Sequence, residues 1–145
     1  MLKKRTVSLL LVICISVSLL TIGNALDARA STYLSSYSAT VFAESNGDMS
    51  VDVVVRGLKL MDKIGVNSMR IEEKYSENGS WHYYDTLYGV DDPDTFYFYG
   101  KRTFLNSIPF KGTPGYYYRV YATVYAGDSE GCDTGITPSN SALCK

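Results

Sequence analysis

Residues 116–126 read YYYRVYATVYA, and this stretch decides the fold class. Large side chains recur at every second position, which is the period of a β-strand with one buried and one solvated face. We expect Tyr116, Tyr118, Val120 and Val124 to face a core. A Gly-Thr-Pro-Gly turn at 112–115 comes directly before the segment. The stretch therefore predicts the longest strand of an all-β domain.

The same period of two runs through most of the chain after residue 30, and clusters of Gly, Pro, Asn and Asp interrupt it. Residues 57–65 form a less regular connection, and helical spacing is absent outside the N-terminal segment. This pattern is typical of an antiparallel β-sandwich of about seven strands. Besides 116–126, the strands are expected at 37–43, 49–56, 66–75, 81–88, 96–99 and 103–110.

Residues 1–30 are predicted to be a cleaved secretory signal. A short basic start precedes an uncharged apolar run over 6–22, and the small residues Ala28 and Ala30 follow at the spacing that signal peptidase accepts. Cleavage there makes Ser31 the first residue of a mature, exported chain. Such a signal is the chain's only expected contact with a membrane.

Two alternatives for this segment stay open. Cleavage after Ala25 also fits the small-residue pattern, and an uncleaved apolar run would act as a membrane anchor, because it approaches the minimum length that spans a bilayer.

Residues 31–145 are expected to form one domain, and their charge limits the choice of partner. The signal removes four of the 14 basic residues and one of the 15 acidic residues, which leaves ten and fourteen and a net charge of −4. This acidic balance argues against nucleic acid or an anionic membrane as the main partner.

Two cysteines, Cys132 and Cys144, remain after cleavage. In an oxidising exterior a disulfide between them is the natural expectation. A fully extended segment would hold them about 40 Å apart, whereas a disulfide needs Cα atoms within about 7 Å. The chain must then reverse between them, and the Thr-Pro-Ser-Asn sequence at 137–140 is the expected turn.

The segment from Phe110 to residue 139 resembles the end of a fibronectin type III domain, and Trp81 after an Asn-Gly hairpin resembles its middle strands. That resemblance implies an immunoglobulin-like sandwich. It also implies that Tyr116 is a structural corner tyrosine whose hydroxyl bonds back to the preceding turn. The whole chain further resembles small uncharacterised secreted proteins of Gram-positive bacteria with a Tyr-rich C-terminal half, a likeness that implies no activity.

No catalytic or metal-binding constellation is recognised, so we expect neither an enzyme nor a bound cofactor. His82 is the only histidine. The Gly-Asp-Ser-Glu-Gly sequence at 127–131 echoes a serine-protease loop, but it lacks the second glycine that shapes an oxyanion hole. The acidic loop at 91–94 offers oxygen ligands for calcium without the spacing of a defined motif.

Tyrosine is the one compositional excess, and all 13 tyrosines lie after residue 30. On the longest strand Tyr117, Arg119, Tyr121 and Tyr125 should alternate outward as a candidate binding face for an extracellular protein or glycan. Cross-strand packing is the competing reading of these residues. Two further hypotheses remain: a matrix protein that assembles through this face or its sheet edges, and a small hydrolase with an unrecognised site. The oligomeric state is left open.

Overall fold

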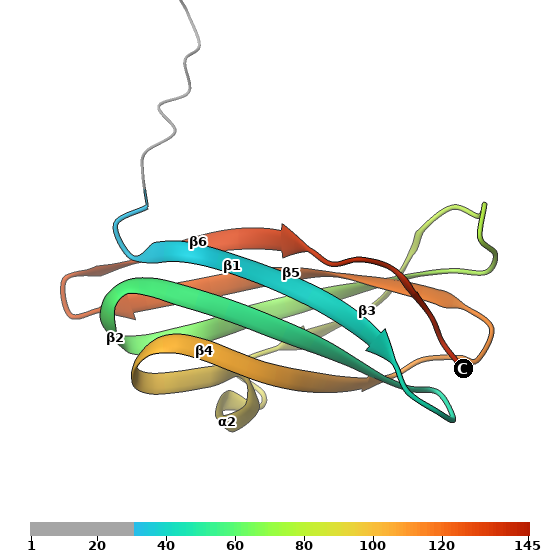
Figure 1. Ribbon diagram of the computed structural model, residues 1–145, viewed down its shortest axis with the longest axis horizontal. Coiled ribbons are helices and arrows are strands. Elements are labelled where there is room, and N and C mark those ends of the chain that lie inside the picture. The colour runs from blue at the N-terminus through green and yellow to red at the C-terminus, as the bar shows by residue number, and fades with distance from the viewer. Residues whose placement is uncertain (1–30) are drawn as a thin grey trace, which may run out of the picture. The chain divides into compact units, whose positions relative to one another are not determined.

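The computed structural model describes residues 31–145, and the predicted signal sequence, residues 1–30, lies outside the described part. The all-β prediction is confirmed there: the chain forms one antiparallel sheet of seven strands with a single-turn helix (Figure 1). Within residues 31–145 no helix is long and apolar enough to cross a membrane. The elements are β1 (Leu34–Ala43), β2 (Asp48–Lys74), β3 (His82–Tyr88), α2 (Pro93–Phe96), β4 (Tyr97–Lys111), β5 (Tyr117–Asp128), β6 (Gly131–Pro138) and β7 (Ala142–Leu143).

The organising element is β2, a single strand of 27 residues. Two strands separated by an irregular connection at 57–65 were expected here, but the connection is itself extended, and a register shift between Arg56 and Met61 marks it. The first half of β2 pairs with β1 and with the end of β4, and the second half pairs with β3, β5 and the start of β4. Because β2 and β4 both continue through the bend, the sheet folds over on itself.

The two halves of the folded sheet share one core. Alternation on the first half of β2 buries Met49, Val51, Val53 and Val55, and β5 buries five side chains in the same alternating way. Fully burying an aliphatic side chain contributes about 1.5–3 kcal/mol. The five on β5 are Tyr118, Val120, Ala122, Val124 and Ala126, and the remaining core residues are Leu34, Ala39, Val41, Met61, Ile64, Val66, Met69, Ile71, Phe96, Tyr97, Phe104, Ile108 and Cys144.

Three residues, at two places in the chain, allow this course of the backbone. Asn46 and Gly47 both have positive φ, 59° and 80°, as the tight turn between β1 and β2 requires. Gly65 pairs with Tyr97 at the start of β4, and a Cβ built on it would stand 2.1 Å from the carbonyl oxygen of Phe96, the last residue of α2. Only glycine fits that approach.

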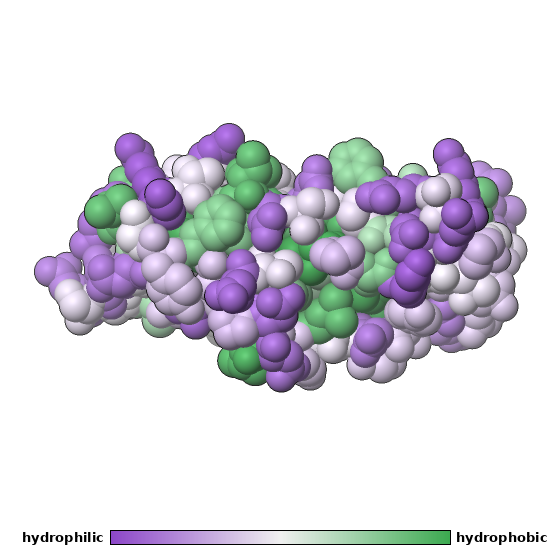
Figure 2. Space-filling model, turned by 90° about the horizontal axis from the view of Figure 1, so that it is seen from below, coloured by the Kyte–Doolittle hydropathy of each residue, from purple (hydrophilic) through white to green (hydrophobic). Residues whose placement is uncertain are grey.

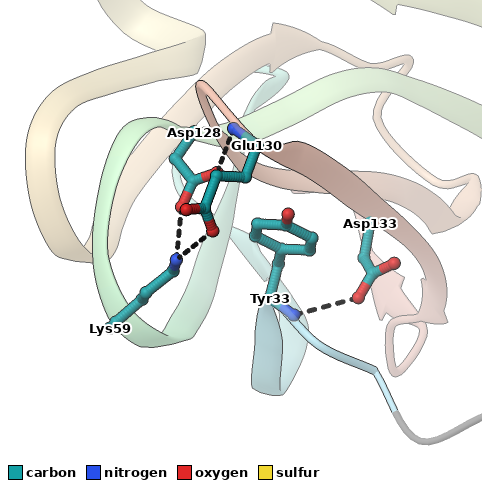
Figure 3. A network of polar contacts seen from close by, with 5 residues as sticks. All are labelled: Tyr33, Lys59, Asp128, Glu130 and Asp133. Carbon is teal, nitrogen blue, oxygen red and sulfur yellow. Dashed lines mark hydrogen bonds and ion pairs between the residues drawn. The ribbon is translucent and has the colours of Figure 1, made fainter.

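The first described residues are fastened to β6. Asp133 Oδ2 accepts hydrogen bonds from the hydroxyl of Ser31 at 2.6 Å and from the backbone N–H groups of Thr32 and Tyr33 at 2.7 and 3.0 Å. Figure 3 shows the Tyr33 contact beside the ion pair between Lys59 and Asp128 at the end of β5. The start of this domain is therefore tied to residues a hundred positions away.

Asn140 closes the side of the sheet between β1 and β6. Its side-chain amide accepts from the N–H of Val41 at 2.7 Å and donates to the carbonyl of the same residue at 3.1 Å. The amide thus makes the two hydrogen bonds that a neighbouring strand would make with Val41, at the outer edge of β1.

The disulfide prediction is wrong in this structure: Cys132 and Cys144 are both free thiols. Cys132 lies opposite Gly127 on β5, whereas the neighbour of Cys144, Leu143, lies opposite Tyr117. Ten positions of β5 separate those two partners, about 33 Å. Residues 137–140 do not reverse the chain, because β6 and β7 run in the same direction along β5.

The corner prediction selects the wrong tyrosine. Tyr116 is half-buried just before β5, with its ring edge-on to Tyr75. The buried residue is Tyr118, whose hydroxyl accepts from the N–H of Thr113 in the preceding turn at 2.8 Å and donates to Glu73 Oε2 at 3.0 Å. The core begins only inside β5, so Tyr118, the second of the inward-facing tyrosines, makes the hydrogen bond to the preceding turn.

Candidate functional site

The facing predicted for residues 116–126 is confirmed along β5, but this strand is not the longest as expected, because β5 has 12 residues whereas β2 has 27 and β4 has 15. Along β5 every second side chain is buried, and Tyr117, Arg119, Tyr121 and Tyr125 point to the outer face. All four are half-buried, which the sequence alone did not predict. Their neighbours across the sheet cover part of each side chain.

The outer face continues over the strands beside β5. Arg119 lies opposite Glu72 on β2, Tyr121 lies opposite Arg70, and Tyr117 lies opposite Lys74. On the far side of β2, Tyr83 of β3 pairs with Glu72, and on the other flank Ile136 of β6 pairs with Thr123. Aromatic and charged side chains therefore meet across four neighbouring strands.

Glu72 is the polar centre of this face. Its side chain is only 11% exposed, and it takes an ion pair from Arg119 at 2.7 Å and another from Arg70 at 3.0 Å. A buried carboxylate needs such partners, because removing a charge from water is costly. Glu72 thus holds both guanidinium groups. The Nε of Arg119 also donates a hydrogen bond to Glu72 Oε2, at 2.8 Å.

The cations are also stacked on rings. Arg119 lies 4.4 Å from the centroid of Trp81 and 5.2 Å from that of Tyr121. Lys74 lies 5.0 Å from Trp81 and 4.9 Å from Tyr117. Each such contact contributes about 0.5–1 kcal/mol at an exposed site, so the rings and cations hold one another in a fixed layer. We call the layer of Arg70, Glu72, Lys74, Trp81, Tyr117, Arg119 and Tyr121 the aromatic–basic face.

An open hollow lies at one end of the aromatic–basic face. It has a volume of about 390 Å³ and is lined by Arg70, Glu72, Tyr121, Thr123 and Ile136. Its size falls within the range of about 300–1,000 Å³ that is usual for small-molecule sites. The hollow offers a guanidinium, a phenol ring and an aliphatic wall to one ligand.

Tyr125 belongs to a separate cluster. Lys63 lies 3.6 Å from the ring centroid of Tyr97 and 5.5 Å from that of Tyr125, between the start of β4 and β5. Burial, followed by a hydrogen bond with Cys132, raises the pKa of Tyr125 above its ordinary value. The stripe predicted on β5 is thus divided: Tyr117, Arg119 and Tyr121 belong to the aromatic–basic face, and Tyr125 belongs to the cluster around Lys63.

Sequence reasoning missed four residues of the face: Arg70, Glu72, Lys74 and Trp81. The signal was present, because Arg70, Glu72 and Lys74 alternate with the apolar residues of the third expected strand. These side chains become part of a site only because their strand pairs with β5, and the alternation of side chains does not show which strands are neighbours.

A second, smaller hollow of about 260 Å³ opens between β3, β4 and the acidic loop. Leu87, Phe96 and Ile108 supply its apolar lining, while Asp91 and Asp92 lie at its rim. From the side of α2, Figure 2 shows apolar surface between hydrophilic side chains near the middle of the molecule. Neither strand has a second strand partner on this side among residues 31–145.

The residues weighed for catalysis lie apart. His82 stacks on Tyr75 at 5.3 Å and pairs with Glu73, at the end of β2 that lies opposite Tyr118. The turn that contains the serine-protease echo lies at the other end of β5, where Asp128 is paired with Lys59. Among residues 31–145 no group of three or more His, Cys, Asp or Glu side chains is placed to hold a metal ion.

Comparison with known proteins finds no matching family model, no matching curated protein and no matching solved structure. The resemblance to fibronectin type III domains therefore stays a prediction. The aromatic–basic face has to be interpreted from its own chemistry.

Proposed function

We propose that this chain is exported and that residues 31–145 act as a non-enzymatic binding module for an extracellular protein or glycan. The aromatic–basic face is the observation that carries the proposal. Tyr, Trp and Arg are the residues that most often dominate binding energy, because they offer large contact areas and several hydrogen-bond donors.

The rigidity of the face supports binding rather than packing alone. Glu72 holds two guanidinium groups, and the stacked cations hold Trp81, Tyr117 and Tyr121. Side chains that are already ordered lose little entropy when a ligand arrives. The adjoining hollow gives that ligand a place to insert.

The proposal is tested with the protein on glycan and protein arrays, with the double variant Tyr117→Ser and Tyr121→Ser beside it. We expect the variant to stay folded by circular dichroism and to lose affinity about tenfold or more. Tyr99→Ser is the matched control, because Tyr99 is 58% exposed on β4, away from this face. If the double variant binds as well as the parent, the face is packing and the proposal fails.

Export has its own test. N-terminal sequencing of protein recovered from culture medium should begin at Ser31. Protein that remains in the membrane fraction with Met1 intact would contradict this part of the proposal.

Self-association through sheet edges is a second candidate function, favoured by the open sides of β3 and β4. Unpaired strand edges are templates for a further strand, and Leu105 on β4 is 62% exposed. Sedimentation equilibrium distinguishes the two functions, since an assembling protein gains mass with concentration and a binding module does not.

A further inference from the structure

We propose that the ligand of the aromatic–basic face is an acidic polysaccharide, bound with a sugar carboxylate on Arg70 and the apolar side of a sugar ring on Tyr121 and Ile136. This inference rests on the proposed function and names the chemical class of its ligand. The residues that carry it line the hollow of about 390 Å³.

Charge complementarity is the first argument. Arg70, Lys74 and Arg119 contribute three positive charges to the face and Glu72 one negative charge, a net of +2. Residues 31–145 as a whole carry −4, so the remainder of the domain carries −6. The face is a positive island on an acidic protein, and such an island attracts anions to one place.

The second argument is that the two arginines differ in how many of their hydrogen-bond donors are already used. Arg119 donates both Nε and a terminal nitrogen to Glu72, so one side of its fork is already used. Arg70 spends one terminal nitrogen on Glu72, and its side chain is 57% exposed. Arginine has five N–H donors in a planar fork that matches a carboxylate. Arg70 lines the hollow and keeps free donors, and its guanidinium also lies 5.9 Å from the ring centroid of Tyr83 on β3.

The third argument concerns the walls of the hollow. Ile136 is 64% exposed, so its side chain is available for contact, and Tyr121 lines the same hollow. A sugar ring has an apolar side that packs on such surfaces and polar edges that accept hydrogen bonds from a guanidinium. Both kinds of contact are available within one hollow.

The strand arrangement favours a glycan over an extended peptide. At the hollow β2 lies between β3 and β5, and β5 lies between β2 and β6. The backbone groups of β2 and β5 are used within the sheet, so a peptide could add a strand only at the outer edge of β6, the last strand of the path. Over β2 and β5, which supply four of the five lining residues, recognition must run through side chains.

The face is also long enough for a polymer. Arg70 and Lys74 are four positions apart on β2, about 13 Å, and Lys74 lies between the rings of Trp81 and Tyr117. An acidic chain that starts in the hollow can bring a second carboxylate to Lys74.

The test is affinity electrophoresis of the protein in native gels that contain one of three polymers. Polygalacturonate offers rings and carboxylates, its fully methyl-esterified form offers rings without charge, and poly-glutamate offers charge without sugar rings. We expect strong retardation by polygalacturonate and at least tenfold weaker binding to the other two. Equal binding to poly-glutamate would reduce the interaction to simple charge attraction and overturn the proposal.

Variants connect the binding to the hollow. Arg70→Gln should weaken binding to polygalacturonate by about tenfold to a hundredfold, the loss expected for a charge-assisted hydrogen-bonded pair. Lys101→Gln is the control, since it removes the same charge from an exposed position on β4. Equal losses in the two variants would overturn the assignment to Arg70, and thermal melting shows that both are folded.

The outcomes separate this inference from the proposed function. Equal retardation by the acidic and the esterified polymers leaves a glycan-binding module and removes the preference for acid. If none of the three polymers retards the protein, the assignment of an acidic glycan is wrong. The proposed binding function is then decided by the arrays and by the Tyr117 and Tyr121 double variant.

Discussion

The hydroxyl of Tyr118 fastens the turn before β5 to the end of β2, and Tyr118→Phe removes that link while keeping the ring. The lost hydrogen bonds join Tyr118 to the backbone N–H of Thr113 and to the carboxylate of Glu73. A neutral hydrogen bond contributes about 0.5–1.5 kcal/mol and one to a charged group about 1.5–3 kcal/mol. Because Thr113 is exposed and regains a water partner, we expect the free energy of unfolding to fall by about 2–3 kcal/mol at pH 7.

The same hydroxyl predicts how this difference changes with pH. Burial raises the pKa of Tyr118 from 10.0 to about 12. The folded state therefore holds the proton more tightly than the unfolded state, and the resulting stability is present below pH 10 and is lost as the pH rises to about 12. Two pKa units correspond to about 2.7 kcal/mol. The gap in stability between the parent and Tyr118→Phe should close over that interval.

Urea unfolding followed by the fluorescence of Trp81, the only tryptophan, measures both effects. Tyr116→Phe is the matched control: the hydroxyl of Tyr116 makes no hydrogen bond within residues 31–145, so its loss should change stability by less than about 0.5 kcal/mol. Equal losses in the two variants would refute the assignment of the corner to Tyr118. A gap that is unchanged from pH 10 to 12 would refute the role of its proton.

Three further predictions concern other parts of the domain. Iodoacetamide should label exposed Cys132 quickly and buried Cys144 slowly, because burial raises the pKa of the Cys144 thiol; a thiol count of zero in unreduced protein would contradict the free cysteines. Asp133→Ala should speed amide hydrogen exchange at Tyr33 and its N-terminal neighbour and cost about 1–3 kcal/mol, since it leaves their donors unpaired; unchanged exchange would show that the anchor is dispensable. Gly65→Ala should cost more than about 2 kcal/mol in urea melts, because its Cβ overlaps a backbone carbonyl, and a fully stable variant would contradict that close approach.

Sequence reasoning succeeded where local alternation decides the outcome. The facing of β5 follows from the period of its side chains. It failed where distant strands decide. Three outcomes depend on which strands pair. They are the continuity of β2 through Gly57, the burial of Tyr118 in place of Tyr116 at the corner, and the separation of the two cysteines.

The candidate site shows the same division. Alternation alone placed Tyr117, Arg119 and Tyr121 on the outer face, and the structure agrees. The partners that turn this stripe into a face, above all Glu72 and Trp81, come from strands whose order no local pattern records. The face could have been predicted only by a search for strand pairings that bring the charged positions of one strand beside the aromatic positions of another.

The pairing of β2 also sets the order in which this protein can form. β2 is hydrogen-bonded to β1, β3, β4 and β5, and one of its last partnerships joins Lys63 to Gly127, 64 positions later. Contacts so distant along the chain make folding slow. A ribosome must therefore synthesise the chain as far as the end of β5 before the sheet can close, and the nascent chain stays without its core until that point.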